Sequence, residues 1–260
     1  MTLTEIRQAL ETRGLRPLKQ LGQNFLHDQN LARWLADHAT ADLFAGATVV
    51  EIGPGLGALT SCLLEKDLRL VALEKDRGLC AFLREKFSGE MQQGRFDLRE
   101  GDALELLPAL EIEPAAICGN LPYYISTPLL MTCLELRAVP SRLFFLMQKE
   151  VGQRLVSPPG HKAYGSLSVL IQAACVVTLV RTLPASVFYP APEIESVAVQ
   201  LVPRPDPLVP RDAWNSFAET VYRGFSQRRK KLSNLLPVAD SRRAEELSPE
   251  QWVELWQKLR

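Results

Sequence analysis

The chain has 260 residues, and its 30 Lys and Arg balance 30 Asp and Glu, so the formal net charge is zero. Apolar residues make up 47% and charged residues 23% of the chain, which excludes a disordered protein and supplies a large core. Nucleic-acid binding would therefore need a local basic patch. No apolar run approaches the roughly 20 residues of a membrane helix, and no signal-peptide pattern opens the chain. We expect a cytoplasmic protein with no membrane contact.

The first two-thirds of the chain alternates apolar, β-branched runs with helical patterns. We predict strands at residues 48–52, 68–73, 95–100, 115–118 and 142–148. The predicted helices are 57–66, 76–87, with Asp76 as N-cap, and 126–136. Strands that alternate with helices predict an α/β fold with a mostly parallel, doubly wound sheet.

The composition changes after two further predicted strands, 174–181 and 196–202, which a proline-rich loop separates. Four prolines between residues 203 and 210 indicate a linker. All later periodic stretches are helical, and they are 212–222, 229–236 and 249–259. We therefore predict a first domain at residues 1–203 and a small all-helical C-terminal domain at 204–260. The five scattered cysteines contain no Cys-x-x-Cys pair, so we predict reduced, buried thiols and no metal site.

A glycine-rich loop, with Gly53, Gly55 and Gly57, lies between a predicted strand and a predicted helix. Glycines there let the backbone turn sharply and approach a ligand. Glu74 ends the next strand and can accept both hydroxyls of a ribose. The G-x-G-x-G spacing favours S-adenosylmethionine over a dinucleotide, although a tight turn without a ligand remains an alternative. Asp102, after the following strand, could be an adenine acceptor, a helix N-cap or both.

The most specific motif is Asn120-Leu121-Pro122-Tyr123-Tyr124, directly after a predicted strand. The carboxyl end of a strand is where open α/β folds bind ligands. The lone pair of an adenine amine is delocalised into the ring, so the amine is a poor nucleophile. The Asn120 side-chain oxygen and the Leu121 carbonyl could each accept one amine hydrogen. Pro122 would hold that carbonyl in place.

Aromatic residues could cover the two faces of such a base. Tyr123 can stack on it, and Phe188 is a second candidate, although Phe188 as an ordinary core residue is the simpler interpretation. A basic cluster could contact RNA phosphates, although such charge runs are usually a solvated helix face. Its members are Arg223, Arg228, Arg229, Lys230 and Lys231. Lys149, Arg154 and the loop at residues 160–164 are weaker candidates.

In combination these motifs resemble the ribosomal RNA adenine N6-dimethyltransferase family, specifically the type that acts on small-subunit RNA. The resemblance covers nearly the whole chain. The segments that carry it are 21–26, 50–57, 71–76, 101–102, 120–130, 145–154, 164–168, 188–196 and 225–232. One departure is Glu195, where the family pattern has Asp before Ser196.

The resemblance implies a Rossmann-like class I methyltransferase domain that uses S-adenosylmethionine, releases S-adenosylhomocysteine and needs no metal. It implies cofactor contacts at Asn24, Leu26, Gly53, Glu74, Asp102 and Asn120, to which the glycine loop adds Gly55. It further implies dimethylation of two adjacent adenosines in the 3′-terminal hairpin of 16S rRNA, late in assembly of the small ribosomal subunit. We expect a monomer.

Three alternatives share some of these features. Methyltransferases of 23S rRNA of the macrolide-resistance type also carry an Asn-x-Pro-Tyr loop. A ribosome-assembly factor could bind immature subunits with catalysis secondary or lost. A dinucleotide-dependent oxidoreductase would explain the glycine loop and Glu74, but gives no role to residues 120–124.

Overall fold

The computed structural model of the chain describes residues 1–18, 21–122 and 125–260. Their contacts divide into two compact units. Unit 1 comprises residues 1–149 and 180–200, and unit 2 comprises residues 150–179 and 201–260.

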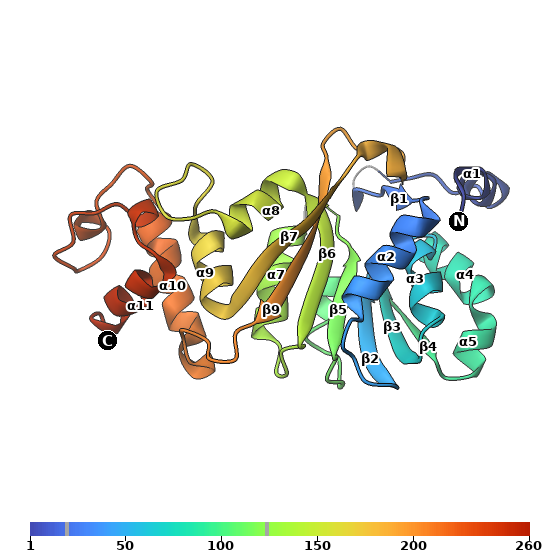
Figure 1. Ribbon diagram of the computed structural model, residues 1–260, viewed down its shortest axis with the longest axis horizontal. Coiled ribbons are helices and arrows are strands. Elements are labelled where there is room, and N and C mark those ends of the chain that lie inside the picture. The colour runs from blue at the N-terminus through green and yellow to red at the C-terminus, as the bar shows by residue number, and fades with distance from the viewer. Residues whose placement is uncertain (19–20, 123–124) are drawn as a thin grey trace. The chain divides into compact units, whose positions relative to one another are not determined.

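Unit 1 contains most of a sheet with the strand order β4-β3-β2-β5-β6-β9-β7, while residues 175–179 and 201–203 of its last two strands belong to unit 2 (Figure 1). The strands are β2 (Ala47–Ile52), β3 (Leu68–Glu74), β4 (Phe96–Glu100), β5 (Ala116–Asn120), β6 (Arg142–Gln148), β7 (Cys175–Leu183) and β9 (Ser196–Pro203). The pairs β2–β3, β3–β4, β2–β5 and β5–β6 are parallel. From β2, the strands β3 and β4 follow on one side, and β5 and β6 follow on the other. These findings confirm the doubly wound sheet and place its switch point between β2 and β5.

Helices lie on both faces of this sheet, as Figure 1 shows for α2 and α3 on one side and α7 on the other. The helices that begin in unit 1 are α1 (Leu3–Thr12), α2 (Gln29–Ala39), α3 (Ala58–Leu64), α4 (Arg77–Lys86), α5 (Ser88–Gln92), α6 (Ala103–Leu106), α7 (Ser126–Glu135) and α8 (Lys149–Val156). Asp76 caps α4 as predicted, because its Oδ1 accepts from the Gly78 and Leu79 amides at 2.8 and 3.1 Å. The helices α1, α2, α5 and α8 were not among the predicted elements.

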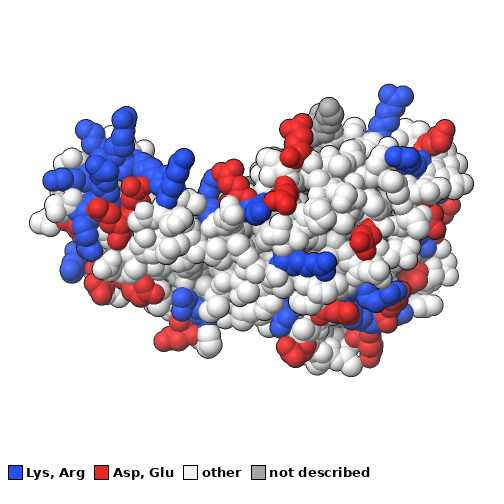
Figure 2. Space-filling view, turned by 45° about the horizontal axis from the view of Figure 1, so that its top comes forward, with Lys and Arg blue, Asp and Glu red and all other residues white. Residues whose placement is uncertain are grey.

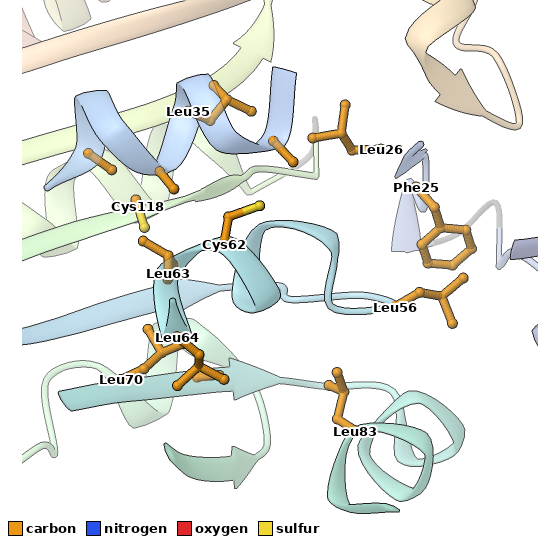
Figure 3. Packing of buried hydrophobic residues seen from close by; sticks show 14 of the residues in the cluster. Phe25, Leu26, Leu35, Leu56, Cys62, Leu63, Leu64, Leu70, Leu83 and Cys118 are labelled. Carbon is orange, nitrogen blue, oxygen red and sulfur yellow. The ribbon is translucent and has the colours of Figure 1, made fainter. Parts of the chain in front are cut away.

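The core of unit 1 lies between the sheet and its helices. Figure 3 shows Leu35 of α2, Leu63 of α3 and Cys118 of β5 within one cluster of buried side chains. All five cysteines are free and buried, which confirms that they are reduced core residues. A second, two-stranded sheet pairs β1 (Phe25–Leu26) with β8 (Phe188–Tyr189) in antiparallel register. It ties the beginning of the chain to a segment about 160 residues later.

Unit 2 consists mainly of α9 (Ser166–Ala174), α10 (Trp214–Phe225) and α11 (Pro249–Gln257). Aromatic side chains hold it together. Trp252 of α11 is fully buried and stacks on Phe225 of α10 with ring centroids 5.5 Å apart. The buried Tyr164 donates from its hydroxyl to the Leu247 carbonyl at 2.8 Å. The compact units differ in their bounds from the predicted division at residues 203 and 204, which stays a prediction.

The predicted helix at residues 229–236 is wrong, since only the 3-10 turn Leu232–Asn234 forms there. The backbone instead pairs with residues further along the chain: the Leu232 amide donates to the Arg242 carbonyl and the Ser233 amide to the Asp240 carbonyl.

No helix in the described residues has both the length and the apolar character that crossing a bilayer requires. Within the same residues, no three His, Cys, Asp or Glu side chains come together as a metal site would require.

Candidate active site

The predicted site residues converge because parallel strands end at the same edge of a sheet. In the register, Ile52 of β2 lies beside Leu73 of β3 and Gly119 of β5. The residues that follow or end these strands, Gly53, Glu74 and Asn120, therefore meet at one edge. Carboxyl ends beside the switch point are the usual ligand site of open α/β sheets.

The glycine loop turns through left-handed backbone conformations, with φ of 64° at Gly53 and 76° at Gly57. Among the described residues, a Cβ atom at Gly53 would have only the Asn120 carbonyl within 4 Å, at 3.9 Å, whereas one at Gly57 would lie 2.7 Å from the Phe87 ring. The Lys86 ammonium closes the turn from α4 by donating to the Leu56 carbonyl at 3.0 Å. The loop therefore leaves room for a ligand on one side and packs tightly on the other.

Substitution of Gly57 tests this packing. We expect Gly57→Ala to lower the free energy of unfolding by about 2–3 kcal/mol, since it combines a left-handed φ with a steric clash. Gly94→Ala is the matched control, because Gly94 has a φ of 72° but nothing within 4 Å of a Cβ atom; we expect it to cost about 1 kcal/mol. Urea unfolding of both variants measures the difference, and equal losses would contradict the tight packing at Phe87.

Glu74 faces the glycine loop at the end of β3 and is only 6% exposed. Its two carboxylate oxygens accept from the Gly55 amide at 3.1 Å and the Asp76 amide at 2.9 Å. Burial raises the pKa of Glu74 to about 7, against the effect of these two hydrogen bonds. The side chain is thus held in one orientation and lines a pocket.

Asp102 has one of the two roles that the sequence left open, that of a helix N-cap, and it also forms an ion pair with Lys75. One oxygen accepts from the Leu104 amide at 3.0 Å as the N-cap of α6, and the other accepts from the Lys75 ammonium at 2.7 Å. The hydrogen bond from Lys75 lowers the pKa of Asp102. Asp102 also lines the same pocket as Glu74. The N-cap is observed, and an adenine contact stays a prediction.

Two adjoining pockets occupy this edge. The first, here named the Glu74 pocket, has an empty volume of about 650 Å³ and is lined by residues 21–25, Glu74, Asp102 and Pro122, among others. The second, the Glu51 pocket, has about 540 Å³ and is lined by Leu26, Glu51, Leu59 and Phe144, among others. Asn24, Phe25, Gly53, Gly55 and Asn120 line both.

Asn120 is the last residue of β5, and among the residues that the structure describes one hydrogen bond orients its side chain. Its Nδ2 donates to the Asn24 carbonyl at 2.8 Å. Because the amide nitrogen is committed to that carbonyl, the Oδ1 atom is the acceptor left for a ligand. The next residue, Leu121, is buried, and its amide donates to the Leu146 carbonyl of β6 at 2.9 Å.

The remaining predicted catalytic residues differ in how far the structure describes them. The Pro122 carbonyl accepts from the Ser126 hydroxyl at 3.2 Å, so this turn is tied to the start of α7. Tyr123 lies outside the described residues. Phe188 is 3% exposed and belongs to the core cluster beside Leu26. It is not among the residues lining the two pockets, and its contact with a base stays a prediction.

Sequence reasoning missed three residues at the site. Glu51 is fully buried in β2, where its carboxylate accepts from the Thr60 hydroxyl at 2.7 Å. A lone acid within an apolar strand was a signal that could have identified it. Lys86 and Gln23 gave no such signal, because their contacts join segments far apart in the sequence.

A family model described as ribosomal RNA adenine dimethylase matches residues 15–254. The chain belongs to this family. The ribosomal RNA small subunit methyltransferase A of Bacillus cereus is 39% identical over 239 residues, which cover 90% of this chain and 81% of that protein. The protein of the same name from Bacillus anthracis matches equally well. The expected family and the methyltransferase class are thereby confirmed, which sets aside the oxidoreductase alternative.

Solved structures confirm the fold class. A dimethyladenosine transferase from Plasmodium falciparum superposes with a TM-score of 0.74 at 21% identity, over 90% of this chain and 96% of that one. The 23S rRNA methyltransferase ErmE gives a TM-score of 0.68 at 23% identity, over 91% and 99% of the two chains. At such identities the similarity shows the Rossmann-like methyltransferase fold and does not distinguish substrates.

Proposed function

We propose that this chain dimethylates the N6 amines of two adjacent adenosines in the 3′-terminal hairpin loop of 16S rRNA during small-subunit assembly. The observation that carries the proposal is Asn120, whose Oδ1 is left as an acceptor at the edge shared by the two pockets. The choice of the small subunit is supported by relatives at 39% identity that are named for it.

The residues present fit S-adenosylmethionine as the methyl donor. Glu74 offers a buried carboxylate for the ribose hydroxyls, and Asp102 offers an acceptor for the adenine amine. Gly53 and Gly55 leave the loop free of side chains where a ligand approaches. Asn24 and Leu26 complete the walls. When bound there, the cofactor supplies an activated methyl group, and we propose no metal.

The chain's own part in the reaction is to orient the amine. The Asn120 Oδ1 and the Leu121 carbonyl each accept one hydrogen of the target amine, which favours a pyramidal nitrogen and directs its lone pair toward the methyl group. Tyr123 and Phe188 are the proposed stacking partners of the base. A strong general base is unnecessary, because the methylated nitrogen becomes acidic and loses its proton afterwards. Positioning and preorganised acceptors supply most of the acceleration.

RNA binding is assigned to the basic cluster of unit 2. Figure 2 shows Lys and Arg side chains gathered on this part of the molecule, at the left of the view. Within the described chain, Arg228 is the one cluster member in an ion pair, with Glu245 at 2.5 Å. Arg223, Arg229, Lys230 and Lys231 extend the positive surface. Phosphate contacts by such residues would make the affinity for RNA fall steeply with salt.

Two of the three weaker candidates from the sequence, Lys149 and Arg154, are already paired in the structure. The Lys149 ammonium lies 2.7 Å from the Glu195 carboxylate, and Arg154 lies 3.2 Å from Glu150. A phosphate would have to compete with these carboxylates. We therefore do not include Lys149 and Arg154 in the proposed RNA surface.

The decisive experiment is methyl transfer from labelled S-adenosylmethionine to small subunits that lack adenine dimethylation, followed by nucleoside analysis. We expect N6,N6-dimethyladenosine in 16S rRNA. Transfer to 23S rRNA instead would favour the macrolide-resistance alternative. Binding of the subunits without transfer would favour an assembly factor. We further propose that the protein is cytoplasmic and monomeric. Light scattering of the purified protein tests the second point, and a monomer gives a mass near 29.1 kDa.

A further inference from the structure

One wall of the Glu74 pocket comes from outside the sheet. Residues 21–25 line it opposite Gly53, Glu74 and Asp102, yet they precede the first long strand of the sheet by more than 20 residues. The pocket is therefore the space between this segment and the sheet edge. Its width depends on the contacts that hold the segment in place.

Gln23 makes the side-chain contact between this segment and α4. Its Nε2 donates to the Asp76 Oδ2 at 2.9 Å, and its Oε1 accepts from the Leu18 amide at 2.8 Å. Asp76 uses its other oxygen to cap α4, so Oδ2 is free for this bond. Both ends of the Gln23 amide are used, and the orientation of the amide is thereby fixed.

This contact joins the two halves of the site. On one side, the Asp76 amide donates to the Glu74 Oε1 at 2.9 Å. On the other, the residue after Gln23 is Asn24, whose carbonyl accepts from the Asn120 Nδ2 at 2.8 Å. A displacement of Gln23 would therefore shift both the Glu74 carboxylate and the Asn120 amide, which orients the reacting amine.

We propose that Gln23 is a positioning residue, which acts through its hydrogen bond to Asp76 to hold residues 21–26 over the sheet edge. The bond sets the width of the Glu74 pocket and the orientation of Asn120. Its effect on the reaction rests on the proposed function, whereas its effect on the segment does not.

A donor–acceptor exchange tests the proposal. Gln23→Ala removes the bond, and we expect the Kd for S-adenosylhomocysteine, measured by calorimetry, to rise about tenfold. Gln23→Glu should raise the Kd further, because it sets two carboxylates against each other. Adding Asp76→Asn to Gln23→Glu restores a donor and an acceptor in exchanged positions. The introduced asparagine can still cap α4. We expect this double variant to return to within about threefold of the wild-type Kd.

A second measurement needs no ligand. Hydrogen exchange of the amides in residues 21–26 should speed up about tenfold in Gln23→Ala and return toward wild type in the double variant. Asn30→Ala, at an exposed position of α2, is the control and should exchange as the wild type does. Asp76→Asn alone removes the acceptor for Gln23 and should resemble Gln23→Ala.

The proposal is overturned if Gln23→Ala leaves the exchange of residues 21–26 unchanged, or if the double variant is no better than Gln23→Glu. Should the wild type transfer no methyl group, or bind no S-adenosylhomocysteine, the proposed function fails. The exchange data would still decide the role of Gln23.

Discussion

Asn120→Ala is expected to reduce kcat for adenine dimethylation by about 100- to 1,000-fold, the usual loss when one preorganised hydrogen-bonding partner is removed from a reacting group. The substitution deletes the Oδ1 acceptor and also the donor to the Asn24 carbonyl. The amine would then lose one of its two acceptors and the lone pair would no longer be directed at the methyl group. Single-turnover assays on subunits that lack the modification measure this loss.

Two further variants separate the roles of the Asn120 amide. Asn120→Asp keeps acceptor oxygens but places a carboxylate against the Asn24 carbonyl, so we expect intermediate activity. Asn30→Ala removes an exposed asparagine of α2 and should be fully active. Subunit binding, measured separately, should be unchanged in all three variants. If Asn120→Ala stays within threefold of the wild-type rate, the proposed role of the amide is wrong.

The sheet was the most predictable part of the fold, since parallel strands are buried on both faces and appear as continuous apolar runs. The run predicted at residues 68–73 corresponds to β3, and that at 142–148 corresponds to β6. The helix α9 was missed for a related reason. It is buried on most sides, so its sequence lacks the amphipathic period that identifies a surface helix.

The site could be predicted where its residues follow strand ends along the chain, as Glu74 and Asn120 do. It could not be predicted where residues far apart in sequence meet. The two-residue strands β1 and β8 pair across about 160 residues, and no local pattern marks so short a strand. The bond between Gln23 and Asp76 also joins residues far apart in the sequence, as does the contact of Asn120 with the Asn24 carbonyl.

Glu51 is expected to make the stability of the ligand-free protein depend strongly on pH. It is 1% exposed, and its hydrogen bond from Thr60 does not offset the loss of hydration. Burial, with a further contribution from the charge of Glu74, raises the pKa of Glu51 to about 8 from an ordinary value of 4.5, while Thr60 and Lys86 act in the opposite direction. A carboxyl group with this pKa is neutral in the folded chain at pH 6 and ionised in the unfolded chain.

The sign of the dependence follows from which state binds the proton. The folded chain holds it more tightly, so the stabilisation is fully present below pH 4.5 and is lost as the pH rises through about 8. The difference between the two pKa values corresponds to a loss on the order of 3–5 kcal/mol. Glu74, whose pKa is raised to about 7, adds a dependence of the same sign.

Glu51→Gln should remove the Glu51 part of this dependence, because the amide stays neutral at every pH and can still accept from Thr60. We expect the variant to be no more stable than wild type at pH 5, since its amide nitrogen is buried. At pH 9 it should be more stable by several kcal/mol. Urea unfolding between pH 5 and 9 measures the pH at which the two free energies of unfolding become equal. The exposed Glu135→Gln is the control. If the stability of Glu51→Gln and wild type changes with pH in parallel, Glu51 is already ionised in the folded chain, stabilised by the positive charge of Lys86.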